Sequence, residues 1–292
     1  MTIMNYKKNS LKNLVVSAGF ALTLGGVFSG TASATPLELA LVIDSSGSMS
    51  EIQYGLQLDG YKNAFSSGSF YDDYILGSSY DSLVVKAFQF STGVVAQTDW
   101  VTITNNSEAT SFGNLFNATE MDQKESWGHT YGDTTNPLSG MTNTEGALLA
   151  AMTSLMDNSI DSGKMVIDIS TDGRPTVCDG GTYGGGVDTN CDSGETPRSA
   201  ALAAADLARS NGITVNALGI GGIDVTFLQD LVNGTPDGFY LNANTFDDFG
   251  GVIQTKLGRE IKGDSISIPE PATFALMGLG LIGIGATKRR KK

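Results

Sequence analysis

Three short segments of the sequence carry oxygen-bearing side chains at spacings that suit a metal ion. The first runs from Asp44 to Ser48 (DSSGS), the second from Thr171 to Gly173 (TDG) and the third from Gly140 to Thr144 (GMTNT). Carboxylate and hydroxyl oxygens are hard ligands, which Mg²⁺, Ca²⁺ and Mn²⁺ prefer. Two carboxylates among neutral hydroxyls leave such a cation short of negative charge, so a carboxylate from another molecule can complete its shell. The segments therefore predict a divalent-cation site that captures acidic groups.

These segments lie where strands are expected to end. Leu37 to Ile43 is nearly all apolar, as a strand buried on both faces is, and it leads into the first segment. Lys164 to Ser170 is expected to be another buried strand, and it leads into the second segment. The third segment precedes a helix expected over Thr144 to Met156. In doubly wound sheets, ligands bind where loops leave the carboxyl ends of the strands. Folding is therefore expected to bring the three segments together.

Strands and helices alternate along the rest of the chain. We expect further strands over Leu83–Phe90, Trp100–Thr104 and Ile213–Ile220. The strand over Trp100–Thr104 could be antiparallel and lie at an edge of the sheet. Further helices are expected over Met49–Phe65, Pro197–Ser210 and Thr245–Ile261, the first weakened by Gly55 and Gly60. The alternation predicts an α/β fold, doubly wound, with a mostly parallel central sheet flanked by helices.

The sequence resembles the von Willebrand factor A-type (VWA) domain over roughly Pro36 to Ile261. The resemblance rests on LALVIDSSGSMS, GMTNTEGALLAAM and MVIDISTDGRP, which match the order and spacing of that family's metal-ion-dependent adhesion site (MIDAS). It implies a Mg²⁺ site, or one for Ca²⁺ or Mn²⁺, at five residues: Asp44, Ser46, Ser48, Thr142 and Asp172. Thr144 is interpreted as a helix cap. In an alternative that stays open, the serines and aspartates only cap the following helices.

Both ends of the chain carry export features. Residues 1–34 have lysines, an apolar run and the small triplet Ala32-Ser33-Ala34, which is the order of a signal peptide. Pro269-Glu270-Pro271, an apolar run and a basic end resemble a PEP-CTERM sorting signal. That resemblance implies a Gram-negative bacterium and processing by an exosortase. We expect a VWA-like domain over 35–262, a linker over 263–271, and a membrane helix with a basic tail over 272–292.

The exported part is strongly acidic. From Thr35 to Ile268 the sequence has 10 Lys and Arg against 30 Asp and Glu, a net charge of −20. Such a charge repels nucleic acid and anionic lipid, so no nucleic-acid binding is expected. The only cysteines, Cys178 and Cys191, are predicted to form a disulfide, because an exported chain meets an oxidising compartment.

Two further loops adjoin the predicted site. The glycine-rich loop closed by the cysteines is interpreted as a surface loop, with Ca²⁺ binding by Asp179, Asp188 and Asp192 as the alternative. The segment Trp127 to Tyr131 holds His129, the only histidine, and is expected to approach the same face.

The function that these features predict is adhesion and not catalysis. We expect an exported protein, at the cell surface or in the extracellular matrix and transiently anchored in the membrane, that grips a carboxylate of a protein or acidic polysaccharide through its metal. Two alternatives stay open. One is a metal-dependent hydrolase of matrix polymers, with Asp172 and a metal-bound water as general base; the other is a purely structural matrix protein.

Overall fold

The computed structural model describes residues 35–116, 141–179, 187–188, 191, 195–236 and 238–263. Five parallel strands form most of the central sheet: β1 (Leu37–Asp44), β2 (Leu83–Phe90), β5 (Lys164–Thr171), β8 (Ile213–Ile220) and β9 (Tyr240–Ala243). Along the sheet they follow the order β2-β1-β5-β8-β9. The short strands β3 (Val94–Ala96) and β4 (Val101–Ile103) pair antiparallel with β2. The fold class predicted from the sequence, a mostly parallel α/β sheet flanked by helices, is confirmed.

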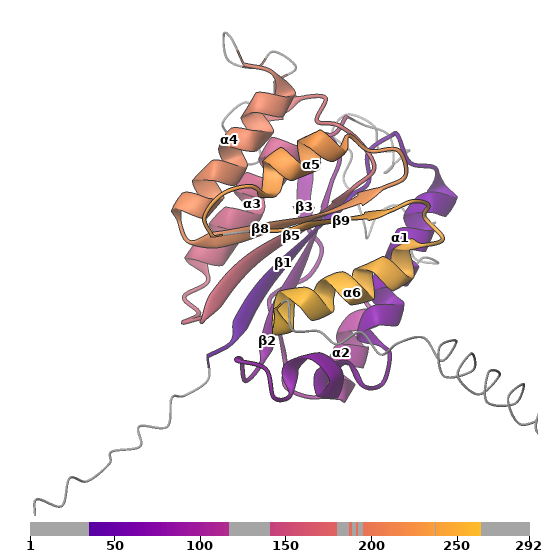
Figure 1. Cartoon of the computed structure of the whole chain (residues 1–292), viewed down its shortest axis with the longest axis vertical. Helices are drawn as coiled ribbons and strands as arrows, with labels where there is room; N and C mark the ends of the chain where they lie inside the picture. Colours follow the sequence, from indigo (N-terminus) through magenta and orange to yellow (C-terminus); the bar gives the residue numbers. More distant parts are fainter. Residues whose placement is uncertain are drawn as a thin grey trace, which may run out of the picture. The chain divides into compact units, whose positions relative to one another are not determined.

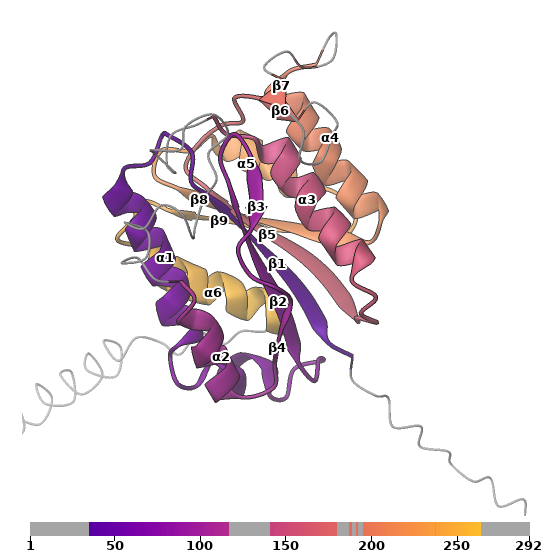
Figure 2. The ribbon, with the colours of Figure 1, turned by 180° about the vertical axis from the view of Figure 1, so that it is seen from behind.

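Helices cover both faces of this sheet, as Figures 1 and 2 show. One face carries α1 (Glu51–Phe65), α2 (Asn106–Gly113) and α6 (Phe249–Lys262). The other carries α3 (Thr144–Asp157), α4 (Pro197–Ser210) and α5 (Val225–Val232). A short π-helix, η1 (Tyr71–Ile75), follows α1. Among the residues described, no helix is both long and apolar enough to cross a membrane.

Strand β1 shows why the sequence folds with helices on both faces of the sheet. All eight of its residues are buried. Leu39 and Leu41 pack on the side of α1 and α6, whereas Ala40 and Val42 pack on the side of α3 and α4. Because successive side chains of a strand point to opposite faces, a continuous apolar run is what a strand between two helical layers needs.

Several elements differ from the sequence-based expectations. The last helix was predicted from Thr245, but α6 begins at Phe249 because Thr245 to Asp248 form a turn in which the Thr245 hydroxyl donates to the Asp248 carboxylate at 2.9 Å. Helices α2 and α5 and strand β9 were not predicted. The predicted signal peptide, Pro-Glu-Pro segment, C-terminal membrane helix and the Trp127–Tyr131 segment with His129 lie outside the described residues.

Candidate metal centre

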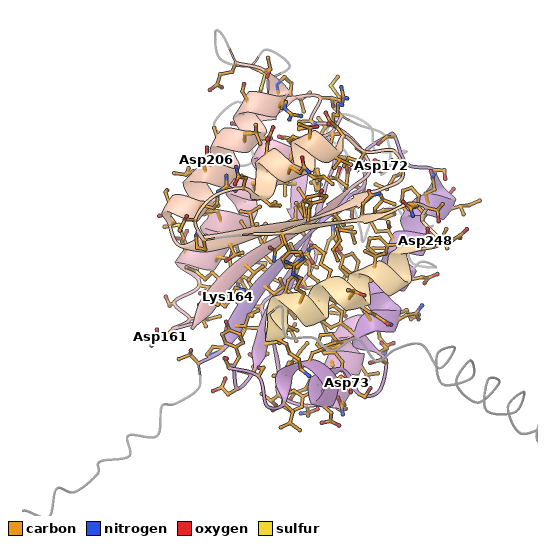
Figure 3. All side chains as sticks on the ribbon, viewed as in Figure 1. Asp73, Asp161, Lys164, Asp172, Asp206 and Asp248 are labelled. Carbon is orange, nitrogen blue, oxygen red and sulfur yellow. A yellow bond between two sulfur atoms is a disulfide. The ribbon has the colours of Figure 1, made fainter. Side chains whose placement is uncertain are left out.

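Parallel register places the first two predicted segments side by side. Ile43 of β1 lies opposite Ser170 of β5, so Asp44 and Thr171 end neighbouring strands. The Thr171 hydroxyl donates to one carboxylate oxygen of Asp44 at 2.5 Å, and the backbone N–H of Ser46 donates to the other at 2.8 Å. Figure 3 shows Asp172 at this end of the sheet, with Lys164 at the start of β5 toward the opposite end. The carboxyl ends of β1 and β5 therefore form the floor of the site.

The first loop is held by both of its neighbours. The Ser45 hydroxyl donates to the carbonyl of Phe90 at the end of β2 at 3.0 Å. Ser50 then caps α1 in a reciprocal bond pair with Gln53, which fixes where the helix begins. The serine hydroxyls are left facing the second loop: Ser46 Oγ lies 3.1 Å from Ser48 Oγ, and Ser48 Oγ donates to Asp172 at 2.6 Å.

Hydrogen bonds on two sides hold the third loop beside the other two. On one side the backbone N–H of Met141 donates to the Thr92 hydroxyl at 2.7 Å. On the other side the N–H of Thr142 donates to the Thr176 hydroxyl at 2.7 Å, and the Thr142 carbonyl accepts from the Thr176 N–H at 2.9 Å. Asn143 caps α3, with its side chain accepting from the N–H of Gly146, so the cap predicted at Thr144 falls one residue earlier.

Between these loops, at Gly173, there is room for a group about the size of a methyl, because an added Cβ atom would reach only van der Waals contact. A Cβ atom built on Gly173 would lie 3.4 Å from Ser48 Oγ and 3.5 Å from Thr142 Oγ1. All five predicted residues thus converge: Asp44, Ser46 and Ser48 on the first loop, Thr142 on the third and Asp172 on the second. Hydroxyls and carboxylates around such a space are a donor set that fits a hard dication.

The electrostatics of the two carboxyl groups also suit a cation. Burial and, to a lesser extent, the nearby charge of Asp172 raise the pKa of the Asp44 carboxyl group, and the result is a pKa of about 7. The hydrogen bonds from Thr171 and Ser46 act in the opposite direction and limit this rise. Burial likewise raises the pKa of Asp172, against the hydrogen bond from Ser48. Within the described residues, neither carboxylate has an ion-pair partner. A dication here would remove part of the cost of burying both charges.

Other metal-site chemistry is not seen in the described part of the chain. It contains no group of three or more His, Cys, Asp or Glu side chains placed to hold an ion. The side chains of Asp179, Asp188 and Asp192, offered as a Ca²⁺ alternative, lie outside the described side chains. The disulfide between Cys178 and Cys191 is confirmed, with Cα atoms 5.2 Å apart. It joins the ends of a loop whose strands β6 (Cys178–Asp179) and β7 (Val187–Asp188) pair antiparallel.

Two supporting residues were not recognised from the sequence. Thr171 was noted only as part of its loop, although it is the donor that holds Asp44. Gln57 of α1 is fully buried, donates to the Asp44 carbonyl at 2.9 Å and accepts from Ser170 at 3.0 Å. Its signal was available: a glutamine lies on the apolar side of α1 between Tyr54 and Tyr61, where a polar residue needs buried partners.

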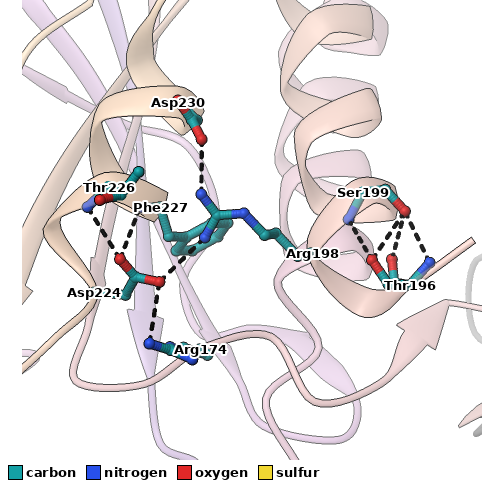
Figure 4. A network of polar contacts seen from close by, with 8 residues as sticks. All are labelled: Arg174, Thr196, Arg198, Ser199, Asp224, Thr226, Phe227 and Asp230. Carbon is teal, nitrogen blue, oxygen red and sulfur yellow. Dashed lines mark hydrogen bonds and ion pairs between the residues drawn. The ribbon is translucent and has the colours of Figure 1, made fainter.

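An ion-pair network adjoins the second loop (Figure 4). Asp224, the cap of α5, accepts from Arg174 and from Arg198, each at 3.3 Å. Arg198 also pairs with Asp230 at 2.7 Å. Asp224 therefore ties the loop after Asp172 to α5.

Similarity to solved structures defines the class of protein as one with the VWA-type fold. The pilus adhesin SpaC of Lactobacillus rhamnosus GG is 21% identical with a TM-score of 0.52, covering 78% of this chain and 31% of SpaC. The vWF domain of the type V pili tip protein Mfa5 of Porphyromonas gingivalis is 12% identical with a TM-score of 0.50, covering 81% and 99%. Proximal thread matrix protein 1 of the mussel byssus, with a zinc-occupied MIDAS motif, is 16% identical with a TM-score of 0.50, covering 78% and 48%.

The chain belongs to the family described as "Protein of unknown function (DUF1194)", whose model matches residues 34–265. The PEP-CTERM protein-sorting motif matches residues 267–291, which supports an exported, cell-surface protein. The chain spans about a third of SpaC and about half of the mussel protein. No match is found among curated proteins.

Proposed function

We propose that this protein is an exported adhesion module that binds a divalent cation at Asp44, Ser46, Ser48, Thr142 and Asp172. The bound cation, Mg²⁺ with Ca²⁺ or Mn²⁺ as alternatives, captures a carboxylate on a protein or an acidic polysaccharide. The observation that carries the proposal is the convergence of three loops on the space above Gly173, with two carboxyl groups whose pKa values burial raises.

The surroundings of the space support capture of an external group. Asp44 and Ser46 are buried at its base, whereas Ser48 is exposed and Asp172 is half-buried at its opening. A cation held at the base would therefore be accessible from solvent on one side. The mussel protein binds zinc at its MIDAS motif, and this supports metal binding by the same fold here.

The sorting motif and the adhesin neighbours support the location and the class. The motif implies processing by an exosortase, and pilus adhesins and matrix proteins among the similar structures fit a binding protein better than an enzyme. We further propose a Gram-negative envelope, with transient anchoring before the mature chain is released or retained.

Calorimetric titration of Mg²⁺, Mn²⁺ and Ca²⁺ into the full-length chain tests the metal site. We expect at least one cation to give saturable heat with the wild type and none with Asp44→Ala, because the variant loses a carboxylate at the base of the site. Asp161→Ala is the matched control: it removes an exposed carboxylate near the opposite end of the sheet (Figure 3) and should bind as the wild type does. Equal heats of cation binding for Asp44→Ala and the wild type would contradict the proposal that a metal binds at this site.

A further inference from the structure

Strand β9 forms one edge of the central sheet. Within the described residues it pairs with β8 alone, at the end of the strand order. The carbonyl of Phe239, directly before β9, accepts from the N–H of Ala217 in β8 at 3.0 Å. Because the main-chain groups of successive strand residues point to opposite sides, those of Tyr240 and Asn242 point away from β8. The edge therefore presents N–H and C=O groups with which another strand can pair.

This edge carries no charge, although the exported part of the chain has a net charge of −20. The sequence from Gly238 to Phe246 (GFYLNANTF) is uncharged throughout. Sheet edges exposed to solvent are commonly protected from pairing by charged side chains or by proline, and β9 has neither. The Asn242 side chain is exposed, and those of Tyr240 and Leu241 are half-buried. Strand β9 is therefore open to pairing with another extended chain.

Two hollows adjoin β9 and offer space for the side chains of such a chain. One, of about 450 Å³, lies between the end of α5 and the start of β9, and Val232 and Tyr240 are among the residues that line it. The other, of about 510 Å³, lies between β9 and α6 and is lined in part by Leu241 and Val252. Figure 1 shows β9 running between these two helices. Because alternate side chains of a strand point to opposite faces, a strand added beside β9 would direct its side chains toward both helices.

Charge beyond the carboxyl end of β9 selects the kind of chain. Asp247 and Asp248 follow the uncharged run, and both are exposed. The hollow at the start of β9 is mixed in charge, since Asp230 and Arg259 both line it. A basic side chain beside Asp247 and Asp248 is therefore attracted, and an acidic one is repelled. A second copy of this chain would bring its own net charge of −20 to the surface, which opposes pairing of two copies.

We propose that β9 is a second interaction surface, at which an extended segment of a partner protein adds a strand to the sheet. The segment is uncharged along the length of β9 and carries a lysine or arginine that lies beside Asp247 and Asp248. This proposal goes beyond the proposed function, because the pairing uses main-chain hydrogen bonds at an edge of the sheet and needs no metal.

Fluorescence anisotropy with synthetic peptides tests the proposal on the full-length chain in chelator. The probe is a capped peptide of alternating threonine and valine with a lysine at one end, N-methylated at every second residue so that only one of its edges can pair. We expect saturable binding by the wild type. A twin N-methylated at every residue loses its main-chain donors, and a twin with glutamate in place of lysine is repelled, so each should bind at least about tenfold more weakly.

A pair of variants at residue 242 tests whether the main chain of β9 makes the contact. Asn242→Pro removes an N–H group that points away from β8, so the fold should persist while affinity for the lysine peptide falls at least about tenfold. Asn242→Ala keeps that N–H group and should change the affinity by no more than about twofold. Urea unfolding of both variants measures whether the fold is kept.

A charge reversal tests the basic end of the partner without altering the main chain, and it decides the outcome if Asn242→Pro unfolds. Asp247→Lys should weaken binding of the lysine peptide and strengthen that of the glutamate twin. Asp161→Lys, an exposed control near the opposite end of the sheet (Figure 3), should change neither. Absence of binding by any peptide, equal affinities of the wild type and Asp247→Lys, or a wild-type dimer in sedimentation that Asn242→Pro dissociates would overturn the proposal. These outcomes leave the metal centre untouched, because Asp44→Ala tests it separately.

Discussion

Thr171 is the side chain through which β5 controls the position of Asp44. Its hydroxyl donates to the Asp44 carboxylate at 2.5 Å and lies 3.2 Å from the Gly173 carbonyl and from the Gly173 N–H. One hydroxyl therefore joins Asp44, a proposed metal ligand, to the end of β5 and to Gly173. Residues that orient ligands in this way commonly matter for metal affinity almost as much as the ligands do.

Replacement of Thr171 tests that role. Thr171→Val keeps the shape and removes the donor, so we expect Mg²⁺ affinity to fall about tenfold or more. The unfolding free energy should fall by about 1–3 kcal/mol, because a buried carboxyl group loses a hydrogen bond. Calorimetry with Mg²⁺ and urea unfolding in chelator measure the two effects. Thr171→Ser restores the hydroxyl and should recover most of both; a valine variant with wild-type Mg²⁺ affinity would show that Asp44 is positioned without it.

The crossing of α1 and α6 depends on Gly60, a residue that weakened the prediction of α1. A Cβ atom on Gly60 would lie 2.4 Å from a ring carbon of Phe249 and 3.4 Å from the Cα of Gly250. The Phe249 ring of α6 therefore occupies the space that a side chain at position 60 would need, and the helix backbones come close at Gly250. A residue that is poor for an isolated helix is required by the packing of the pair.

The Gly60 contact gives a prediction with an internal control. Gly60→Ala should lower the unfolding free energy by about 1–3 kcal/mol, because overpacking outweighs the gain of about 1 kcal/mol in helix propensity. Gly251→Ala, in the same helix pair, adds a Cβ with nothing within 4 Å and should be neutral or stabilising. Chemical denaturation of both variants measures the difference. Equal effects would mean that helix propensity alone decides at both positions.

The sequence predicts a strand or helix well where its residues are apolar because the whole element is buried. Strands β1, β5 and β8 are rich in apolar residues and almost entirely buried, and their predicted bounds agree with the structure to within one residue. Strand β9 has four residues at the edge of the sheet, three of them partly or fully exposed, so it has no apolar run to detect. Helix α2 carries an Asn105 cap to the N–H of Glu108, a local signal that was present in the sequence and was not used.

The candidate site was predictable to a similar degree, and for a comparable reason. Local motifs placed the three loops, but the contacts that hold them together join residues far apart in sequence. Thr176 is hydrogen-bonded to Thr142, and Gln57 is hydrogen-bonded to both Asp44 and Ser170. Such pairings depend on the packed fold: the pattern of α1 indicates that Gln57 is buried, but no spacing within one segment indicates which residues it contacts.

One buried cluster of charged residues joins the central sheet to its last helix, α6. Lys256 and Glu260 of α6 and Asp168 of β5 are all buried, and Lys256 pairs with both carboxylates, at 2.7 Å to Glu260. Asn216 of β8 donates to Glu260 at 3.0 Å, and Tyr61 of α1 faces the same cluster. One cation therefore serves two carboxylates in the core, and burial together with the Asp168 charge raises the pKa of Glu260 to about 7.

That raised pKa sets how stability should change with pH. The ordinary pKa of a glutamate is 4.5, so between about 4.5 and 7 the folded chain holds a proton on Glu260 that the unfolded chain releases. This proton contributes on the order of 3 kcal/mol to the free energy of unfolding. The contribution is complete below pH 4.5 and is lost as pH rises through 7. Glu260→Gln does not titrate, so the wild type should lose unfolding free energy relative to this variant across that window. Denaturation of both in the same chelator buffer, in which the titration of Asp44 cancels from the difference, measures it. A difference that stays constant from pH 4.5 to 7, or that favours the wild type as pH rises, would show that Glu260 remains ionised in the core.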